Sequence, residues 1–216
     1  MAAALYERER SGVGQVVDTS MLGGQLALLT YQAGSYFATG KAPGLSGNRH
    51  GSIAPYETFE ASDGYVNVAC GTEGMWKAFC KALNFEPLLD DPRFTLIKDR
   101  VANREPLVEA IQARLSTLTV AEVVSTLEAV DVPCGPIFNL ADVFDDPQTE
   151  HLQLRQRIQH PKVGEISQTG FPWRLSETPA EIKLPPPLLG QHTDDVLAEL
   201  GYAPDEIANL HTEGAV

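Results

Sequence analysis

Apolar positions recur at helical spacing in several stretches of the chain. Leu22, Leu26 and Leu29 follow this spacing and predict a helix over about 20–37, which Gly40 ends. The same pattern, or a capping residue, predicts six more helices: 2–10 ended by Gly12 and Gly14; one with Met75, Trp76, Phe79, Cys80 and Leu83; one from Asn103 with Leu107, Ile111 and Leu115; one opened by the capping box at Thr119; a short one capped by Asn139; and a last one capped by Thr193 and ended by Gly201.

Short apolar runs beside turn residues predict the strands. The runs 56–61 and 65–70 flank Ser62-Asp63-Gly64, a turn signal, and therefore predict a β-hairpin. A second hairpin is expected from 154–159 and 165–169, and a short strand from 15–18. Because the predicted strands are few and scattered between helices, an α/β or α+β arrangement is expected.

Glycine and proline divide the chain into parts. Residues 41–55 are rich in Gly, Pro, Ser and Asn, which predicts a loop and a domain boundary. Val-Pro-Cys-Gly-Pro at 132–136 predicts a rigid connector, and the proline-rich run 178–187 predicts an extended crossing segment because proline interrupts helices and central strands.

Charge narrows the class of partner. The 29 acidic and 16 basic residues give a formal net charge of −13, and no cluster of Lys and Arg offsets it. Nucleic acid is therefore a poor candidate partner. A polyanionic small ligand would also have to find its positively charged donors largely elsewhere.

The cysteines and the apolar runs indicate the kind of cellular compartment. Cys70, Cys80 and Cys134 form no CxxC pair and leave an odd count, which favours neither a disulfide framework nor a zinc site and suits a reducing compartment. No apolar run approaches the ~20 residues that span a bilayer, and the first residues lack a signal-peptide core. The sequence predicts a soluble protein without a membrane partner, cytoplasmic or, in a eukaryote, mitochondrial.

Familiar catalytic signatures are missing. The sequence has no phosphate-binding GxxxxGK[ST] motif and no HExxH zinc motif, and Gly12-Val13-Gly14 lacks the third glycine of a dinucleotide fingerprint. The five histidines are dispersed without metal-ligand spacing. No metal ligand is therefore assigned.

One loop and one carboxylate stand out as candidate site residues. In the loop, two glycines allow close backbone approach while the polar side chains offer donors, so it could close over an anionic ligand or could be a solvated connector. Glu73 could act as a site carboxylate, or could favour the positive N-terminus of the helix that carries Trp76. The loop consists of Gly47, Asn48, Arg49, His50, Gly51 and Ser52.

A succession of motifs along the whole chain resembles the class III CoA-transferases. The family includes formyl-CoA, carnitine-type and dicarboxylate CoA-transferases and the α-methylacyl-CoA racemases, and the second and last motifs are most similar to the succinyl-CoA:glutarate type. The motifs are GVGQVVD at 12–18, GNRHGSIAPYETFEASDGY at 47–65, DPRF at 91–94, VANRE at 101–105, VPCGPI at 132–137, DPQ at 146–148, HPKVGEI at 160–166 and PPPLLGQHTDDVL at 185–197.

The resemblance implies an architecture. Family members have a Rossmann-like large domain built from both ends of the chain and a small α+β domain inserted between, and two subunits interlock. Here 1–41 would end the first part of the large domain, 42–169 would be the small domain with its linkers, and 170–216 would return to the large domain. The partner would be a second copy of the chain or the N-terminal half of the fold.

The resemblance also implies a reaction in which CoA and acyl-CoA are substrates and no cofactor is permanently bound. An aspartate attacks the acyl-CoA thioester, an aspartyl-CoA thioester follows, and a small carboxylic acid, perhaps a dicarboxylate, accepts the CoA. Loop 47–52 would shield these intermediates from water. On this alignment the aspartate precedes Met1, so no residue here is assigned as catalytic and the chain alone is expected to be inactive.

Two alternatives remain open at this stage. An α-methylacyl-CoA racemase would use acid and base residues to move an α-proton, and Glu73 matches a family glutamate three residues before the aromatic position of Trp76. The chain could instead be a non-catalytic remnant or a regulatory subunit that pairs with a complete homologue.

Overall fold

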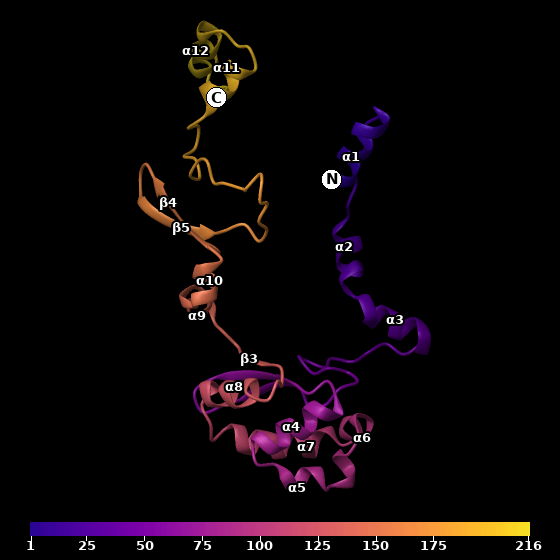
Figure 1. Ribbon diagram of the computed structural model, residues 1–216. Coiled ribbons are helices and arrows are strands. Elements are labelled where there is room, and N and C mark those ends of the chain that lie inside the picture. The colour runs from indigo at the N-terminus through magenta and orange to yellow at the C-terminus, as the bar shows by residue number, and fades with distance from the viewer. The chain divides into compact units, whose positions relative to one another are not determined.

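The computed structural model describes all residues, 1–216, and contains both helices and strands, which confirms the expected α/β class (Figure 1). The chain forms two compact units, Met1–Pro136 and Ile137–Val216. Each is described by itself. The domain boundaries expected at 41/42 and 169/170 stay predictions.

The first unit opens with the predicted helices. Gly12 and Gly40 end α1 and α3 in the left-handed conformation, with φ of 74° and 66°. The helix expected over 20–37 is broken at Thr30, whose φ of 36° is positive. No residue of these helices is buried. Their bounds are α1 Ala2–Ser11, α2 Met21–Leu28 and α3 Thr30–Thr39.

The strand expected over 15–18 is wrong. These residues adopt no regular structure, because no other strand of the chain pairs with them to satisfy their backbone groups. The apolar run there, Val16-Val17, was too short to distinguish a strand from an extended linker.

An antiparallel sheet of three strands, in the order β1-β2-β3, lies after the loop. Strands β1 (Tyr56–Glu60) and β2 (Tyr65–Ala69) confirm the first predicted hairpin. The connector expected over 132–136 is wrong for its last part, because β3 (Cys134–Pro136) pairs with β2. The prolines were misleading, since an edge strand tolerates a residue that cannot donate a hydrogen bond.

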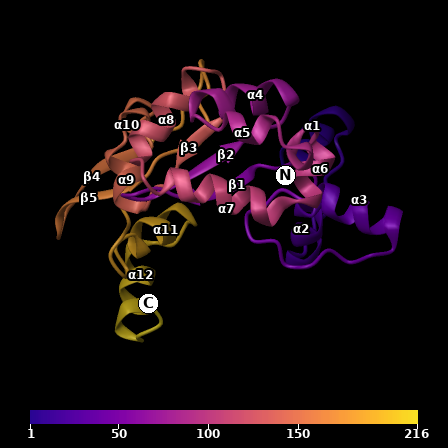
Figure 2. The same ribbon diagram turned by 90° about the horizontal axis from the view of Figure 1, so that it is seen from below.

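Helices pack against one face of this sheet. Helix α7 lies against β1, and α8 lies against β2 and β3 (Figure 2). The helices α4, α7 and α8 were expected, including the Thr119 capping box, whereas three shorter elements were not. The bounds are α4 Glu73–Ala82, α5 Glu86–Leu89, the 3-10 helix η1 Pro92–Phe94, α6 Ile97–Ala102, α7 Arg104–Leu115 and α8 Val120–Glu128.

The core of the first unit lies between the sheet and these helices. Its members are the apolar residues at the helical and alternating positions of the sequence, and burying each large side chain contributes about 1.5–3 kcal/mol. The rings of Phe79 and Trp76 stack with centroids 5.8 Å apart. Fully buried members include Phe59, Val66, Val68, Trp76, Phe79, Leu83, Phe94, Leu107, Ile111, Leu115, Val123 and Leu127.

The second unit contains the second predicted hairpin and four helices. Strands β4 and β5 pair antiparallel, and Asn139 caps α9 as expected. The proline-rich run 178–187 contains no helix or strand. The bounds are α9 Leu140–Asp145, α10 Pro147–His151, β4 Arg155–His160, β5 Gly164–Thr169, α11 Thr193–Glu199 and α12 Pro204–Thr212.

Two expectations about the end of the chain are wrong. Thr193 does not cap α11, because it is already the first helical residue and His192 occupies the cap position without a side-chain hydrogen bond. Nor is α11 the last helix, since α12 follows it. Pro204 in the first turn with Asp205 and Glu206 is a helix-start signal that the apolar pattern alone did not reveal.

No helix of the chain combines the length and the apolar character that crossing a membrane requires.

Candidate functional site

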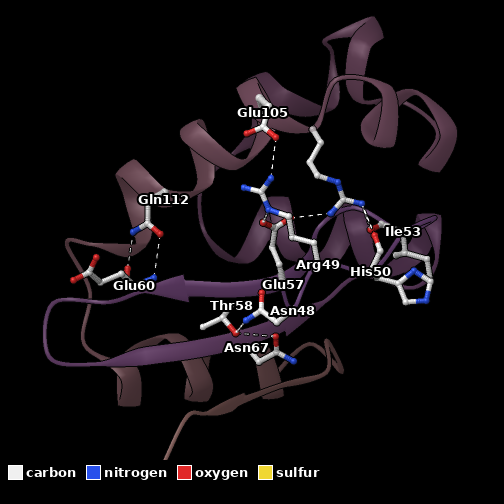
Figure 3. Close-up of polar contacts among 11 residues, drawn as sticks. Asn48, Arg49, His50, Ile53, Glu57, Thr58, Glu60, Asn67, Glu105 and Gln112 are labelled. Carbon is white, nitrogen blue, oxygen red and sulfur yellow. Dashed lines mark hydrogen bonds and ion pairs between the residues drawn. The ribbon is translucent and has the colours of Figure 1, made fainter. Parts of the chain in front are cut away.

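The candidate loop 47–52 lies between α3 and β1, and a buried carboxylate anchors it. Glu57 of β1 is only 3% exposed; its Oε1 accepts from Arg104 Nη1 and its Oε2 forms an ion pair with Arg49 Nε, each at 2.9 Å (Figure 3). Burying a carboxylate without partners is unfavourable, so these guanidinium groups stabilise the position of Glu57. Arg49, Glu57 and Arg104 are hereafter the Glu57 clamp.

The Glu57 clamp reaches the loop backbone through Arg104, the first residue of α7. Its Nη2 donates to the carbonyl oxygen of His50 at 2.6 Å and to that of Ile53 at 2.8 Å. One largely buried side chain, 12% exposed, therefore ties the start of α7, strand β1 and the loop together. Charge-assisted hydrogen bonds thus hold the backbone at His50 and at the adjoining Ile53.

The side chains of Arg49 and Asn48, at the start of the loop, have further partners. Arg49 Nη1 donates to Glu105 Oε1 at 2.8 Å, and the Glu57 carboxylate raises the pKa of Arg49 despite partial desolvation. Asn48 Nδ2 donates to Thr58 Oγ1 on β1. Both side chains already have partners, and Arg49 faces two carboxylates, although the sequence counted both simply as donors of the loop.

His50 is the most constrained residue of the loop. Its backbone N–H donates to the Tyr56 carbonyl at 3.0 Å, and its ring stacks on that of Tyr56 with centroids 5.1 Å apart and planes inclined by 11°. The ring of Tyr31 in α3 lies 6.3 Å away and nearly parallel. The Nδ1 atom accepts from the Ser52 backbone N–H at 3.2 Å.

Glu73 lies outside this cluster, in the first turn of α4. Its carboxylate accepts from the Ile97 backbone N–H and from Arg100 Nη1, both at 2.8 Å. Partial desolvation raises the pKa of Glu73, but these hydrogen bonds and the Arg100 charge outweigh it and hold the pKa below its usual value. The carboxylate thus links α4 to α6, and its assignment as a racemase acid or base stays a prediction.

Sequence reasoning missed three residues that build this region. Arg100 is fully buried and donates to Glu73 and to the carbonyls of Ala54 and Phe94. Its guanidinium lies 5.0 Å from the centre of the Trp76 ring. Glu57 and Arg104 were also missed, although a charged residue two positions before Phe59 on the inward side of a strand was a usable signal.

The remaining candidates for chemistry lie apart from the loop. The chain brings together no group of three His, Cys, Asp or Glu side chains that could hold a metal ion. Cys70, Cys80 and Cys134 are free thiols whose pKa values burial raises, that of Cys70 to about 12. His211 pairs with Asp194 at 2.7 Å between α12 and α11.

Known proteins resemble this chain over nearly all of its length. It is 37% identical over 215 residues to the succinyl-CoA:glutarate CoA-transferase of Mus musculus, which covers 99% of the chain and 49% of that protein. It is 33% identical over 198 residues to the succinate–glutarate CoA-transferase of Agrobacterium fabrum, covering 92% of the chain and 50% of that protein. The chain spans about half the length of the curated relatives it matches.

Solved structures agree with these relatives. The structure of a CAIB/BAIF family protein from Brucella suis matches 92% of the chain and 51% of its own chain, with a TM-score of 0.77 and 34% identity. The sequence profile described as CoA-transferase family III matches residues 1–193. The resemblance inferred from the motifs is confirmed, and the chain belongs to CoA-transferase family III.

Proposed function

We propose that this chain forms the C-terminal half of an enzyme that exchanges CoA between an acyl-CoA and a small carboxylic acid. Succinyl-CoA as donor and glutarate as acceptor are the first pair to test. The observation that carries the proposal is the 37% identity over 215 residues to a succinyl-CoA:glutarate CoA-transferase. A relative named acetyl-CoA:oxalate CoA-transferase, 36% identical over 176 residues, supports the wider class of acid substrates.

The proposed reaction begins at an aspartate carboxylate that lies on polypeptide other than this chain. Its oxygen attacks the thioester carbonyl, the C–S bond breaks, and a mixed anhydride and free CoA thiolate result. The thiolate then attacks the aspartyl carbonyl, which releases the donor acid and leaves aspartyl-CoA. The acceptor carboxylate attacks the aspartyl-CoA thioester, which gives a second mixed anhydride and again frees the CoA thiolate. The thiolate then attacks the acceptor's carbonyl in this anhydride, forming the new acyl-CoA and releasing the aspartate.

In this proposal loop 47–52 keeps water away from the anhydride and thioester intermediates. Both intermediates hydrolyse if water reaches them, so covalent catalysis succeeds only in a shielded site. The Glu57 clamp supports this role, because it fixes the backbone at His50 and at the adjoining Ile53 through contacts within the chain itself. A loop fixed in advance loses little conformational entropy when a substrate binds.

We also propose that α1, α2 and α3 belong to a large domain completed by other polypeptide, either the N-terminal half of the fold or a second copy of the chain. Their apolar side chains support this, because none of them is buried within this chain. Large exposed apolar residues of the three helices are Leu5, Tyr6, Met21, Leu22, Leu26, Leu28, Tyr31, Tyr36 and Phe37.

A transfer assay with two proteins tests the proposal. One is the chain by itself, and the other is a chimera that joins to it the half of the mouse relative that lies outside the matched region. With succinyl-CoA and glutarate, the chimera is expected to form glutaryl-CoA, whereas the chain alone forms none and traps no enzyme-bound CoA thioester.

Three other results would replace the proposal. Turnover by the chain alone would show that the nucleophile is within residues 1–216. Deuterium incorporation at the α-carbon of an acyl-CoA without CoA exchange would favour the racemase alternative. A folded chimera without either activity would favour a non-catalytic subunit.

A further inference from the structure

The donors of the 47–52 loop fall into two groups. Arg49 and Asn48 are engaged, by Glu57 and Glu105 in one case and by Thr58 in the other. In contrast, His50 Nε2, the Gly51 backbone N–H and Ser52 Oγ make no hydrogen bond within the chain. Apart from Nη2 of Arg49, whose guanidinium already faces two carboxylates, the unengaged donors of the loop therefore carry no fixed positive charge.

Among these donors, only the His50 imidazole is fixed as a side chain. The ring is stacked on Tyr56, and the backbone on either side of it is held by the Tyr56 carbonyl and by Arg104. Figure 3 shows the ring turned away from the Glu57 carboxylate. A donor held in this way meets a ligand at a small entropic cost.

The hydrogen bond at Nδ1 determines which ring nitrogen can donate. Because Nδ1 accepts from the Ser52 backbone N–H, its lone pair is occupied and a neutral ring carries its proton on Nε2. In the neutral ring, the Nε2–H group is thus a donor without a partner within the chain. Protonation at Nδ1 would place two donors against one another.

We propose that His50 is the residue of this loop that contacts the acid substrate, with Nε2–H donating a hydrogen bond to a carboxylate oxygen. The inference rests on the proposed function for the class of ligand, a small carboxylic acid. The loop supplies a neutral donor because its one guanidinium group, that of Arg49, already faces the carboxylates of Glu57 and Glu105. Such a donor binds a carboxylate and still releases it during exchange.

The test is a long-range ¹H–¹⁵N NMR titration of the full chain with succinate. His50 should show the Nε2–H tautomer, and its Nε2 signal should shift saturably with succinate but not with the neutral analogue succinamide. His160 is a matched control, because its Nδ1 likewise accepts a backbone N–H, that of Lys162 at 3.1 Å, on the β4–β5 turn. Its signals should not change.

Two substitutions at His50 distinguish the loss of the Nε2–H donor from a disruption of the loop structure. In His50→Asn the amide oxygen can still accept from Ser52, but the distal donor is lost, so the dissociation constant for succinate should rise at least about tenfold. In His50→Gln the longer side chain can place an amide N–H near the position of Nε2, so the affinity for succinate should return to within about threefold of that of the unmodified chain. His160→Asn should bind like the unmodified chain.

The outcomes are decisive for His50 whatever the transfer assay gives. An Nδ1–H tautomer, no saturable shift with succinate, or unchanged affinity in His50→Asn would each overturn the inference. If the chimera transfers CoA while His50 does not respond, the inference alone fails. If His50 binds succinate while no transfer occurs, the proposed function alone fails.

Discussion

Replacing Glu57 by Gln tests whether the buried carboxylate holds the loop and its sheet. The change keeps the shape of the side chain but removes the charge that faces Arg49 and Arg104. Removing one member of a buried ion pair costs about 3–5 kcal/mol, because the remaining charge is left buried without compensation. The lower end applies here, since the Arg49 side chain is 40% exposed and Arg104 keeps two carbonyl acceptors.

Glu105→Gln is the matched control. It removes the other carboxylate paired with Arg49, at nearly the same distance, 2.8 Å against 2.9 Å, but the Glu105 side chain is 76% exposed. An exposed pair of this kind contributes less than about 1 kcal/mol. Glu57→Gln should therefore cost more than Glu105→Gln, because Glu57 is buried and also pairs with Arg104.

The assay is urea unfolding followed by tryptophan fluorescence in a Trp173→Phe background. Trp76, 1% exposed, then reports only on the first unit, because Trp173 is the other tryptophan of the chain. With m-values of about 1–3 kcal/mol per molar urea, a loss of about 3 kcal/mol lowers the midpoint by roughly 1–3 M. Equal, small losses for Glu57→Gln and Glu105→Gln would refute the anchoring role.

Three further predictions concern the same unit. Arg100→Met should lower the free energy of unfolding by about 3–5 kcal/mol, because several carbonyls and Glu73 lose their buried donor; a loss below 1 kcal/mol by the same fluorescence assay would contradict this. Because the pKa of Glu73 is lowered in the folded state, its contribution to the free energy of unfolding is present above its unfolded pKa and is lost as pH falls through the folded value. Glu73→Gln should therefore flatten the decline in stability measured below about pH 5. At pH 8, where burial raises their pKa values, Cys70, Cys80 and Cys134 should react with a disulfide reagent slowly in the folded chain and fully in urea; rapid native reaction of one thiol would indicate an activated cysteine.

The sequence predicted those elements whose signals are local and repeated. The hairpin around Asp63, the apolar stripe of α4 and the capping box at Thr119 each depend on residues within a few positions, and each is confirmed. Strand β3 was not predicted, because an edge strand of three residues is defined by its pairing with β2, which a linear pattern does not contain. The break between α2 and α3 at Thr30 was not predicted either, because no glycine or proline marks it in the sequence.

The site was predicted in outline but not in its connections. The loop was selected for its glycines and donors, yet the sequence did not reveal that Arg49 is already paired with Glu57. Nor did it reveal that Glu57 is also bound by Arg104, 47 positions further along the chain. Local reasoning considered Glu73 as a helix-terminus carboxylate, and it does lie in the first turn of α4, but the sequence did not reveal that its oxygens are also bound by α6. Ion pairs between residues distant in the sequence therefore determine which donors remain available to a ligand.

The most direct test of the shielding role is the ratio of hydrolysis to transfer in the chimera, with and without Glu57→Gln. Succinate release without glutaryl-CoA formation measures hydrolysis, and both proteins are compared where Trp76 fluorescence shows them folded. If the anchored loop keeps water from the activated acyl group, the substitution raises the share of hydrolysis several-fold. Transfer and hydrolysis that fall together, with their ratio unchanged, would contradict that role.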